Sequence, residues 1–237
     1  WCGSPSSLFW RPEVFTQVSY ELPDAGFEDC IFCSIVTGDA EASWESRPTG
    51  DSNVACFHNR LKWARVMLLI VPTKHLSQND LWESDVLADA ARLTVEMGDK
   101  HCGDEGYRAI SNFGLQAHQS QTHGHIHVVS GTSRQIQSAQ RISRLVDGDD
   151  VNIDQFEVEE TPFAASISPI NPGTQREMWQ SGKILGASRA ALDMTKKYSP
   201  DGFRLMSSFE PSTADNLAGE NPASLFLLGG GQLGLYV

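Results

Sequence analysis

The chain has 237 residues, 40% of them hydrophobic, which is enough to bury the core of one large domain or two small ones. Its 18 basic and 30 acidic residues give a formal net charge of −12, which excludes the broad positive surface of a protein that binds DNA or RNA polymers. No apolar run approaches the ~20 residues of a membrane span, and five cysteines with one Cys-x-x-Cys pair make a poor disulfide framework. We therefore expect a cytoplasmic protein with no membrane partner.

Hydrophobic patterning predicts an α+β domain in the first half of the chain. Residues 1–24 carry three prolines and are expected to be a surface extension. The elements that follow, in chain order, are strands at 53–58 and 66–71, a helix that Asn79 or Asp80 caps and that runs from Leu81 to Met97, and strands at 107–112 and 123–130. Residues 132–155 are polar and are predicted to be a linker.

Three histidines alternate along the last of these strands. His123, His125 and His127 are separated by single residues, so in a strand their side chains would share one face. Imidazoles repel one another when protonated and need partners when buried, which makes this arrangement costly as mere structure. A surface patch and an opportunistic metal site are the alternatives to a reaction centre.

The second half repeats part of the first. Residues 106–113 align with 202–209, and Trp82 and Met97 match Trp179 and Met194 upstream. Downstream, residues 127–131 align with 225–229, so that the three histidine positions correspond to about Asn221, Ala223 and Leu225. No nucleophile survives there, and the strands within 53–71 have no evident counterpart. The repeat is therefore predicted to be partial and structural.

Several motifs in order resemble the histidine triad (HIT) family. The segment HGHIHVV at 123–129 resembles the triad, His-φ-His-φ-His-φ-φ. Its ordered companions are DCIFCSI at 29–35, FHN at 57–59, LIVPTKH at 69–75, and Asn112 with Gln119-Ser120. The resemblance covers residues 27–131 closely, and residues 156–237 resemble a degenerate, truncated copy. It implies a HIT domain at 25–131, a linker at 132–155 and a degenerate HIT-like repeat at 156–237.

The resemblance also implies an architecture. Each half would be an antiparallel sheet with a packed helix. HIT proteins resemble two-fold dimers, and the degenerate copy would take the place of the second subunit. The apolar stripes of the two helices, which include Trp82 and Trp179, are expected to pack together while the sheets join across a pseudo-two-fold axis. We expect a monomer that contains this internal pseudo-dimer.

What the resemblance implies for activity is nucleotidyl hydrolysis through a covalent phospho-histidine. His125 would attack the α-phosphorus of a nucleoside phosphoramidate, phosphate ester or dinucleoside polyphosphate, with purines favoured. His123, His127 and Ser120 would assist at the phosphate. The nucleotide-binding residues would be Ile31, Phe32, Ile35, Phe57, His58, Asn59, Leu61, Asn112 and Gln119. For any one of the apolar members, a plain core role is an equal alternative.

Three departures bear on the site. Gly124 replaces an apolar residue inside the triad, and His118 stands where the family usually has glycine. Met67 stands in place of a further histidine that binds metal in zinc-bearing members. The resemblance thus leaves Cys30, Cys33 and His123, three of the four ligands that structural zinc takes. We expect no required cofactor, and a structural zinc is the alternative to a pair of reduced core thiols.

Other functions remain open at this point. A nucleotidyl transferase or phosphorylase of the two-repeat branch of the superfamily is one alternative, although that branch typically has glutamine in place of the third histidine, here His127. A nucleotide-binding module with little turnover is another. A metal-binding protein that uses the histidine cluster is the third.

Overall fold

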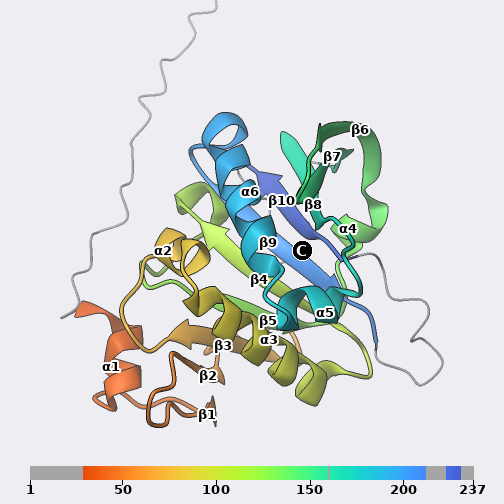
Figure 1. Ribbon diagram of the computed structural model, residues 1–237. Coiled ribbons are helices and arrows are strands. Elements are labelled where there is room, and N and C mark those ends of the chain that lie inside the picture. The colour runs from red at the N-terminus through yellow and green to blue at the C-terminus, as the bar shows by residue number, and fades with distance from the viewer. Residues whose placement is uncertain (1–28, 160, 212–222, 231–237) are drawn as a thin grey trace, which may run out of the picture.

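The computed structural model describes residues 29–159, 161–211 and 223–230, and they form one ten-stranded antiparallel sheet with the order β1-β2-β3-β5-β4-β9-β10-β8-β7-β6 (Figure 1). The predicted extension at 1–24 lies outside the described residues. The elements of the first half are α1 (Ile31–Thr37), β1 (Trp44–Ser46), β2 (Val54–His58), β3 (Met67–Pro72), α2 (Gln78–Glu83), α3 (Val86–Cys102), β4 (Tyr107–Phe113), the 3-10 helix η2 (Leu115–Ala117) and β5 (Ile126–Ser130).

The second half reproduces this order of elements. It contains α4 (Arg134–Ser138), β6 (Gln140–Asp147), β7 (Val151–Glu157), β8 (Phe163–Pro169), α5 (Gln175–Gln180), α6 (Ile184–Tyr198), β9 (Phe203–Phe209) and β10 (Leu225–Gly229). In the sheet, β9, β10, β8, β7 and β6 mirror β4, β5, β3, β2 and β1. The α+β class and the internal pseudo-dimer predicted from the sequence are confirmed.

The two halves join through the pairing of β4 with β9. Tyr107 lies opposite Phe209, Phe113 opposite Phe203, and Ile110 opposite Met206 at the centre. Ile110 and Met206 occupy the same position in the two repeats, so the pseudo-two-fold axis passes through this pair. Residues on both sides of it are buried, and the rings of Tyr107 and Phe209 stack at 4.4 Å between centroids.

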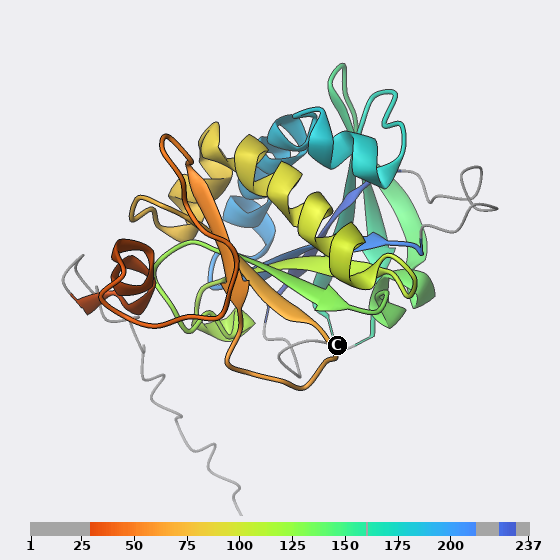
Figure 2. The same ribbon diagram turned by 90° about the horizontal axis from the view of Figure 1, so that it is seen from below.

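Four helices, two from each half, form a layer over one face of the sheet. Figure 2 shows α2 and α3 beside α5 and α6 on the same side of the strands. Trp82 and Trp179 meet edge to face with their centroids 6.4 Å apart, and each indole donates a hydrogen bond to a serine of its own half, Ser111 or Ser207. Ser188 on α6 also donates to the carbonyl of Trp82 on α2. The expected packing of the two apolar helix stripes is therefore observed.

The segment predicted to be a linker is structured. Residues 132–155 contain α4, β6 and most of β7, and β7 extends the sheet by pairing with β8. The strands at 53–71 thus do have counterparts, and the second repeat is not truncated to a helix and two strands. The pattern was missed because β6 is an exposed edge strand, whose ladder is paired on one side only and whose composition is polar.

Smaller differences concern element ends. Ser77, rather than Asn79 or Asp80, caps α2, in a capping box with Asp80, and the expected single helix is divided at Ser84 and Asp85 into α2 and α3. Thr174 and Glu177 form the equivalent box at α5. The strand expected at 123–130 begins only at Ile126. Within the described ranges, no helix combines the length and apolar character that crossing a bilayer needs.

The shared helix layer predicts that the halves unfold together. Trp179→Ala should lower the free energy of unfolding by about 3–5 kcal/mol, because it empties a fully buried site at the contact between the repeats. Urea denaturation followed by circular dichroism measures this, with Leu61→Ala, which removes a side chain 48% exposed, as the control. One transition is expected; two transitions, of which only one shifts, would contradict this prediction.

Candidate active site

His125 is held by its backbone. Its N–H donates to Gln78 Oε1 at 2.9 Å, and its carbonyl accepts from Gln78 Nε2 at 3.0 Å and from Ser111 Oγ at 2.9 Å. Gly124 beside it has no side chain because a Cβ there would lie 2.7 Å from the carbonyl oxygen of Ser77. The triad glycine therefore lets the chain approach the start of α2 closely enough for Gln78 to reach His125.

The hydrogen bonds of His125 fix its tautomer. Nδ1 lies 2.8 Å from the carbonyl oxygen of His123, which can only accept, so Nδ1 carries the proton and Nε2 keeps its lone pair. That lone pair faces His127 Nε2 at 3.1 Å, so His127 Nε2 carries the proton of this contact. The pair thus presents a nucleophilic nitrogen and a proton donor side by side.

Burial keeps this pair neutral. His125 and His127 are 3% and 5% exposed, and loss of hydration lowers the pKa of both imidazoles. For His127 the positive charges that His125 and Arg204 can carry lower the pKa further, well below the ordinary histidine value. Burial therefore favours the neutral form of both rings before any ligand binds.

His123 does not join them. Its Nε2 donates to the carbonyl of Pro72 at 3.0 Å, and its Nδ1 lies 3.4 Å from the sulfurs of both Cys30 and Cys33. The residue lies before β5 begins, in an isolated bridge with Ser77, so the alternation expected of a continuous strand does not apply to it. The expectation that His123 holds phosphate beside His125 and His127 gives way to a separate cluster.

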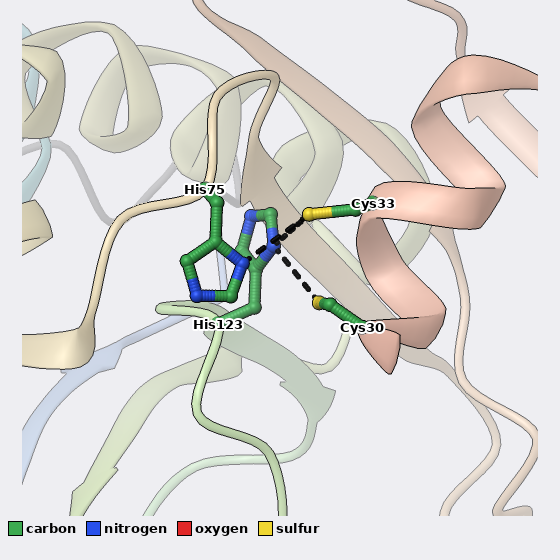
Figure 3. Close-up of side chains that lie close together, drawn as sticks. All are labelled: Cys30, Cys33, His75 and His123. Carbon is green, nitrogen blue, oxygen red and sulfur yellow. Dashed lines mark hydrogen bonds between the residues drawn. The ribbon is translucent and has the colours of Figure 1, made fainter. Parts of the chain in front are cut away.

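That cluster has four members. His75 Nδ1 lies 3.2 Å from Cys33 Sγ, and the donor atoms of Cys30, Cys33, His75 and His123 all lie within 4.8 Å of one another (Figure 3). The cysteines come from the start of α1, His75 follows β3 and His123 precedes β5. Three of these donors, Cys30, Cys33 and His123, were predicted from the sequence. His75 is the fourth; it ends the LIVPTKH motif, which gave no sign of a metal-binding role.

The four donors fit a zinc ion. Two thiolate sulfurs and two imidazole nitrogens are a tetrahedral set whose neighbouring donors would be about 3.5 Å apart around the metal, and the observed contacts are 3.2 to 3.4 Å. The bond from His123 Nε2–H to Pro72 leaves Nδ1 unprotonated and aimed at the sulfurs, as a metal ligand requires. In the metal-free protein burial raises the pKa of Cys33 to about 12, so metal binding would displace protons from the thiols.

A cavity of about 1160 Å³ opens on the sheet face opposite the main helix layer. His125, His127 and Ser120 line it, together with seven of the nucleotide-binding residues predicted from the sequence: Ile31, Phe32, Ile35, Phe57, His58, Asn59 and Leu61. The registers of β2, β3 and β5 put Phe57, Leu69 and His127 side by side across the sheet. The apolar wall thus runs directly up to the histidine pair.

Two predicted nucleotide-binding residues are not among those that line this cavity. Gln119 accepts from the N–H of Gly114 at 2.8 Å and donates to the carbonyl of Gln121 at 2.8 Å, so its side chain shapes the loop that carries Ser120. Asn112 is 2% exposed and its Oδ1 accepts from Arg204. The side-chain oxygens of both residues are thus engaged within the protein.

Other lining residues were missed. Trp44 and Leu69 extend the apolar wall, and Arg47, Arg60 and Lys62 stand with Glu41 as its charged members. The only sequence feature that could have indicated Trp44 as a lining residue is that it is a lone aromatic in a polar stretch. No sequence feature indicated the three basic residues, because the fold alone brings them to the cavity.

In the second repeat, other side chains occupy the positions equivalent to His125 and His127. Gln175 binds the backbone of Ser224 as Gln78 binds that of His125, which makes Ser224 and Phe226 the counterparts of His125 and His127. The sequence alignment, with Ala223 and Leu225, was therefore wrong by one residue, and Asn221 lies outside the described ranges. Phe226 packs on Phe156 with 5.3 Å between ring centroids, and serine and phenylalanine replace the reactive pair. No histidine remains at either position, but the expectation that no nucleophilic side chain survives is corrected, because Ser224 carries a hydroxyl.

Comparisons with known proteins agree with the motifs. The model of the HIT domain matches residues 49–134. An uncharacterized HIT-like protein of Chlamydia trachomatis serovar D is 33% identical over 104 residues, which are 43% of this chain and 91% of that protein. An uncharacterized HIT-like protein of Chlamydia muridarum is 32% identical over 104 residues, which are 43% of this chain and 80% of that protein.

Two solved structures resemble both repeats. A galT-like protein from Arabidopsis thaliana covers 86% of this chain and 82% of its own, with a TM-score of 0.58 and 13% identity. An ADP-glucose phosphorylase from the same plant, with bound ADP-glucose, covers 86% and 80%, with a TM-score of 0.56 and 10% identity. At this identity the likeness establishes the two-repeat fold and no more.

The four-donor cluster leads to a prediction about metal content. Purified protein should bind one zinc ion per chain after dialysis, and Cys33→Ser should abolish stoichiometric binding, because three donors hold zinc far less tightly than four. Elemental analysis measures the zinc, and thiolate-to-metal absorption after Co²⁺ substitution reports the ligands. Cys102→Ser, a buried thiol outside the cluster, is the control. Equal zinc in all three proteins would contradict the assignment.

Proposed function

The chain belongs to the HIT family, and we propose that it is a nucleotidyl hydrolase that acts at the α-phosphorus of a nucleoside phosphoramidate, phosphate ester or dinucleoside polyphosphate. The observation that carries the proposal is the His125–His127 pair, with Nε2 atoms 3.1 Å apart, where an apolar cavity wall ends. In the neutral pair His125 Nε2 offers the nucleophile, and His127 becomes the proton donor once a bound phosphate favours its protonated form.

The reaction we propose has two displacements. His125 Nε2 forms a bond to the α-phosphorus while the bond from phosphorus to the leaving nitrogen or oxygen breaks. His127 acts in its protonated form, since a bound anionic phosphate raises the pKa of a nearby imidazole, and its Nε2 proton passes to the leaving atom. Water then attacks phosphorus, His127 takes one of its protons, and the bond to His125 breaks to release a nucleoside monophosphate.

The apolar wall and the charged rim support a nucleotide as ligand. Phe32, Phe57 and Trp44 offer ring edges and faces to a base, and we infer that purines are favoured because the wall is long. Arg47, Arg60 and Lys62 give the cavity a positive rim in a chain of net charge −12, which favours phosphate. No zinc is needed in these steps; an ion at Cys30, Cys33, His75 and His123 would tie α1 to the segments that carry the site.

Transfer to an acceptor other than water is the second candidate. The two-repeat fold shared with an ADP-glucose phosphorylase favours it, and the covalent intermediate would be the same. Reaction in the presence of inorganic phosphate separates the two, because a phosphorylase would release a nucleoside diphosphate and a hydrolase a monophosphate.

His125→Ala tests the proposed nucleophile. Turnover of adenosine phosphoramidate should fall by about 10³-fold or more, while the affinity for AMP measured by calorimetry should stay within about tenfold, because the substitution removes the chemical step and few ground-state contacts. His101→Ala, which lies outside the cavity, should keep full activity. A His125→Ala protein with the wild-type rate would overturn the assignment.

The positive rim leads to a separate prediction. Replacing both Arg60 and Lys62 with alanine should weaken AMP binding about three- to tenfold and reduce its dependence on salt, because two exposed cations near a phosphate act through a screened attraction. Titration at two ionic strengths measures this. Arg65→Ala, an exposed cation paired with Glu105, is the matched control, and an equal loss in that variant would contradict the role of the rim.

A further inference from the structure

Arg204 is a cation from the second repeat that is buried next to the reactive pair. It lies on β9, is 0% exposed, and stands opposite Asn112 of β4 across the junction of the repeats. The register of β4 with β5 pairs Ile110 with His127, and Ser111 Oγ donates to the carbonyl of His125, so Asn112 lies on the stretch of β4 that adjoins His125. A row of His125, Asn112 and Arg204 therefore crosses from one repeat into the other.

The contact between Arg204 and Asn112 orients an amide. Arg204 Nε donates to Asn112 Oδ1 at 2.8 Å. A guanidinium has donors only, so the amide must turn its oxygen toward β9 and its nitrogen away from it. The Asn112 Nδ2 donors are thereby directed to the β5 side, where His125 lies.

A pseudo-symmetric residue supplies the matched comparison for Arg204. Arg108 occupies the same place in the first repeat, is also buried, and lies opposite Ser208. In the second repeat Ser224 and Phe226 take the places of His125 and His127. Arg108 is therefore buried near positions that carry no histidine. The fold thus accommodates a buried guanidinium at this position in both repeats despite its desolvation cost, and only Arg204 stands near histidines.

We propose that Arg204 is a positioning residue which the second repeat contributes to the active site, and that it sets the amide of Asn112 so that Nδ2 donates to the phosphoryl group as it is transferred to His125. This rests on the proposed function. The active site is then composite: its nucleophile comes from the first repeat and the residue that orients its amide donor comes from the second.

A double-mutant cycle in the full chain tests this proposal. Arg204→Met and Asn112→Ala should each lower kcat for adenosine phosphoramidate about 100-fold, the usual loss when one preorganised donor is removed. If Arg204 acts through Asn112, the double variant should lose no more than about threefold beyond the worse single variant. KM should change less than kcat. Arg108→Met, the matched control, should stay within about threefold of wild type.

Further readouts separate positioning from folding and from the proposed function. Each variant should keep a single cooperative unfolding transition, and if Arg204→Met does not fold, Arg204→Lys takes its place, with an expected loss of about tenfold because an ammonium cannot reproduce the planar donor. Additive losses in an active protein, or an equal loss in Arg108→Met, would overturn the role of Arg204 alone. Wild-type protein with no turnover would overturn the proposed function and this inference with it.

Discussion

The pairing of β4 with β9 is the interaction on which the other features of the molecule depend. Each half offers an open sheet edge and an uncovered helix stripe, which are unstable in water. Joining the edges at Ile110 and Met206 satisfies both backbones and brings Trp82 against Trp179 in the helix layer. With α2, α3, α5 and α6 on one face, the other face near α1 is left for the cavity and its histidines.

Much of this could be predicted from the sequence because it depends on local pattern. The duplicated strand around Tyr107 and Phe203, the helix stripes with Trp82 and Trp179, and the ordered motifs around the triad all led to the observed architecture. The cavity wall of Ile31, Phe32 and Phe57 followed from the motifs as well. These features require only that residues near in sequence keep a regular spacing.

The remaining features depend on contacts between distant segments. His75 and His123 are 48 positions apart and meet only because β3 and the start of β5 lie together. The side chain of His123 does not share a face with His125 and His127, because regular strand geometry begins three residues later, at Ile126. The strand β6 was not predicted because it is an exposed edge strand of polar composition. Asn112 was expected to contact a ligand, and the contact of its amide oxygen with Arg204, which lies 92 positions away, was not foreseen. Pattern alone carries no information about such pairs.

The covalent connection between the repeats has a consequence for how the site is maintained. When two copies of a chain build a site between them, its occupancy falls on dilution, and every substitution appears on both sides of the axis at once. Here the partner of the first repeat is present at a fixed local concentration, so the site persists at any protein level. The two repeats can also accept substitutions independently of each other. Equivalent positions carry arginine in both repeats, Arg108 and Arg204, whereas the residues paired with them, Ser208 and Asn112, differ.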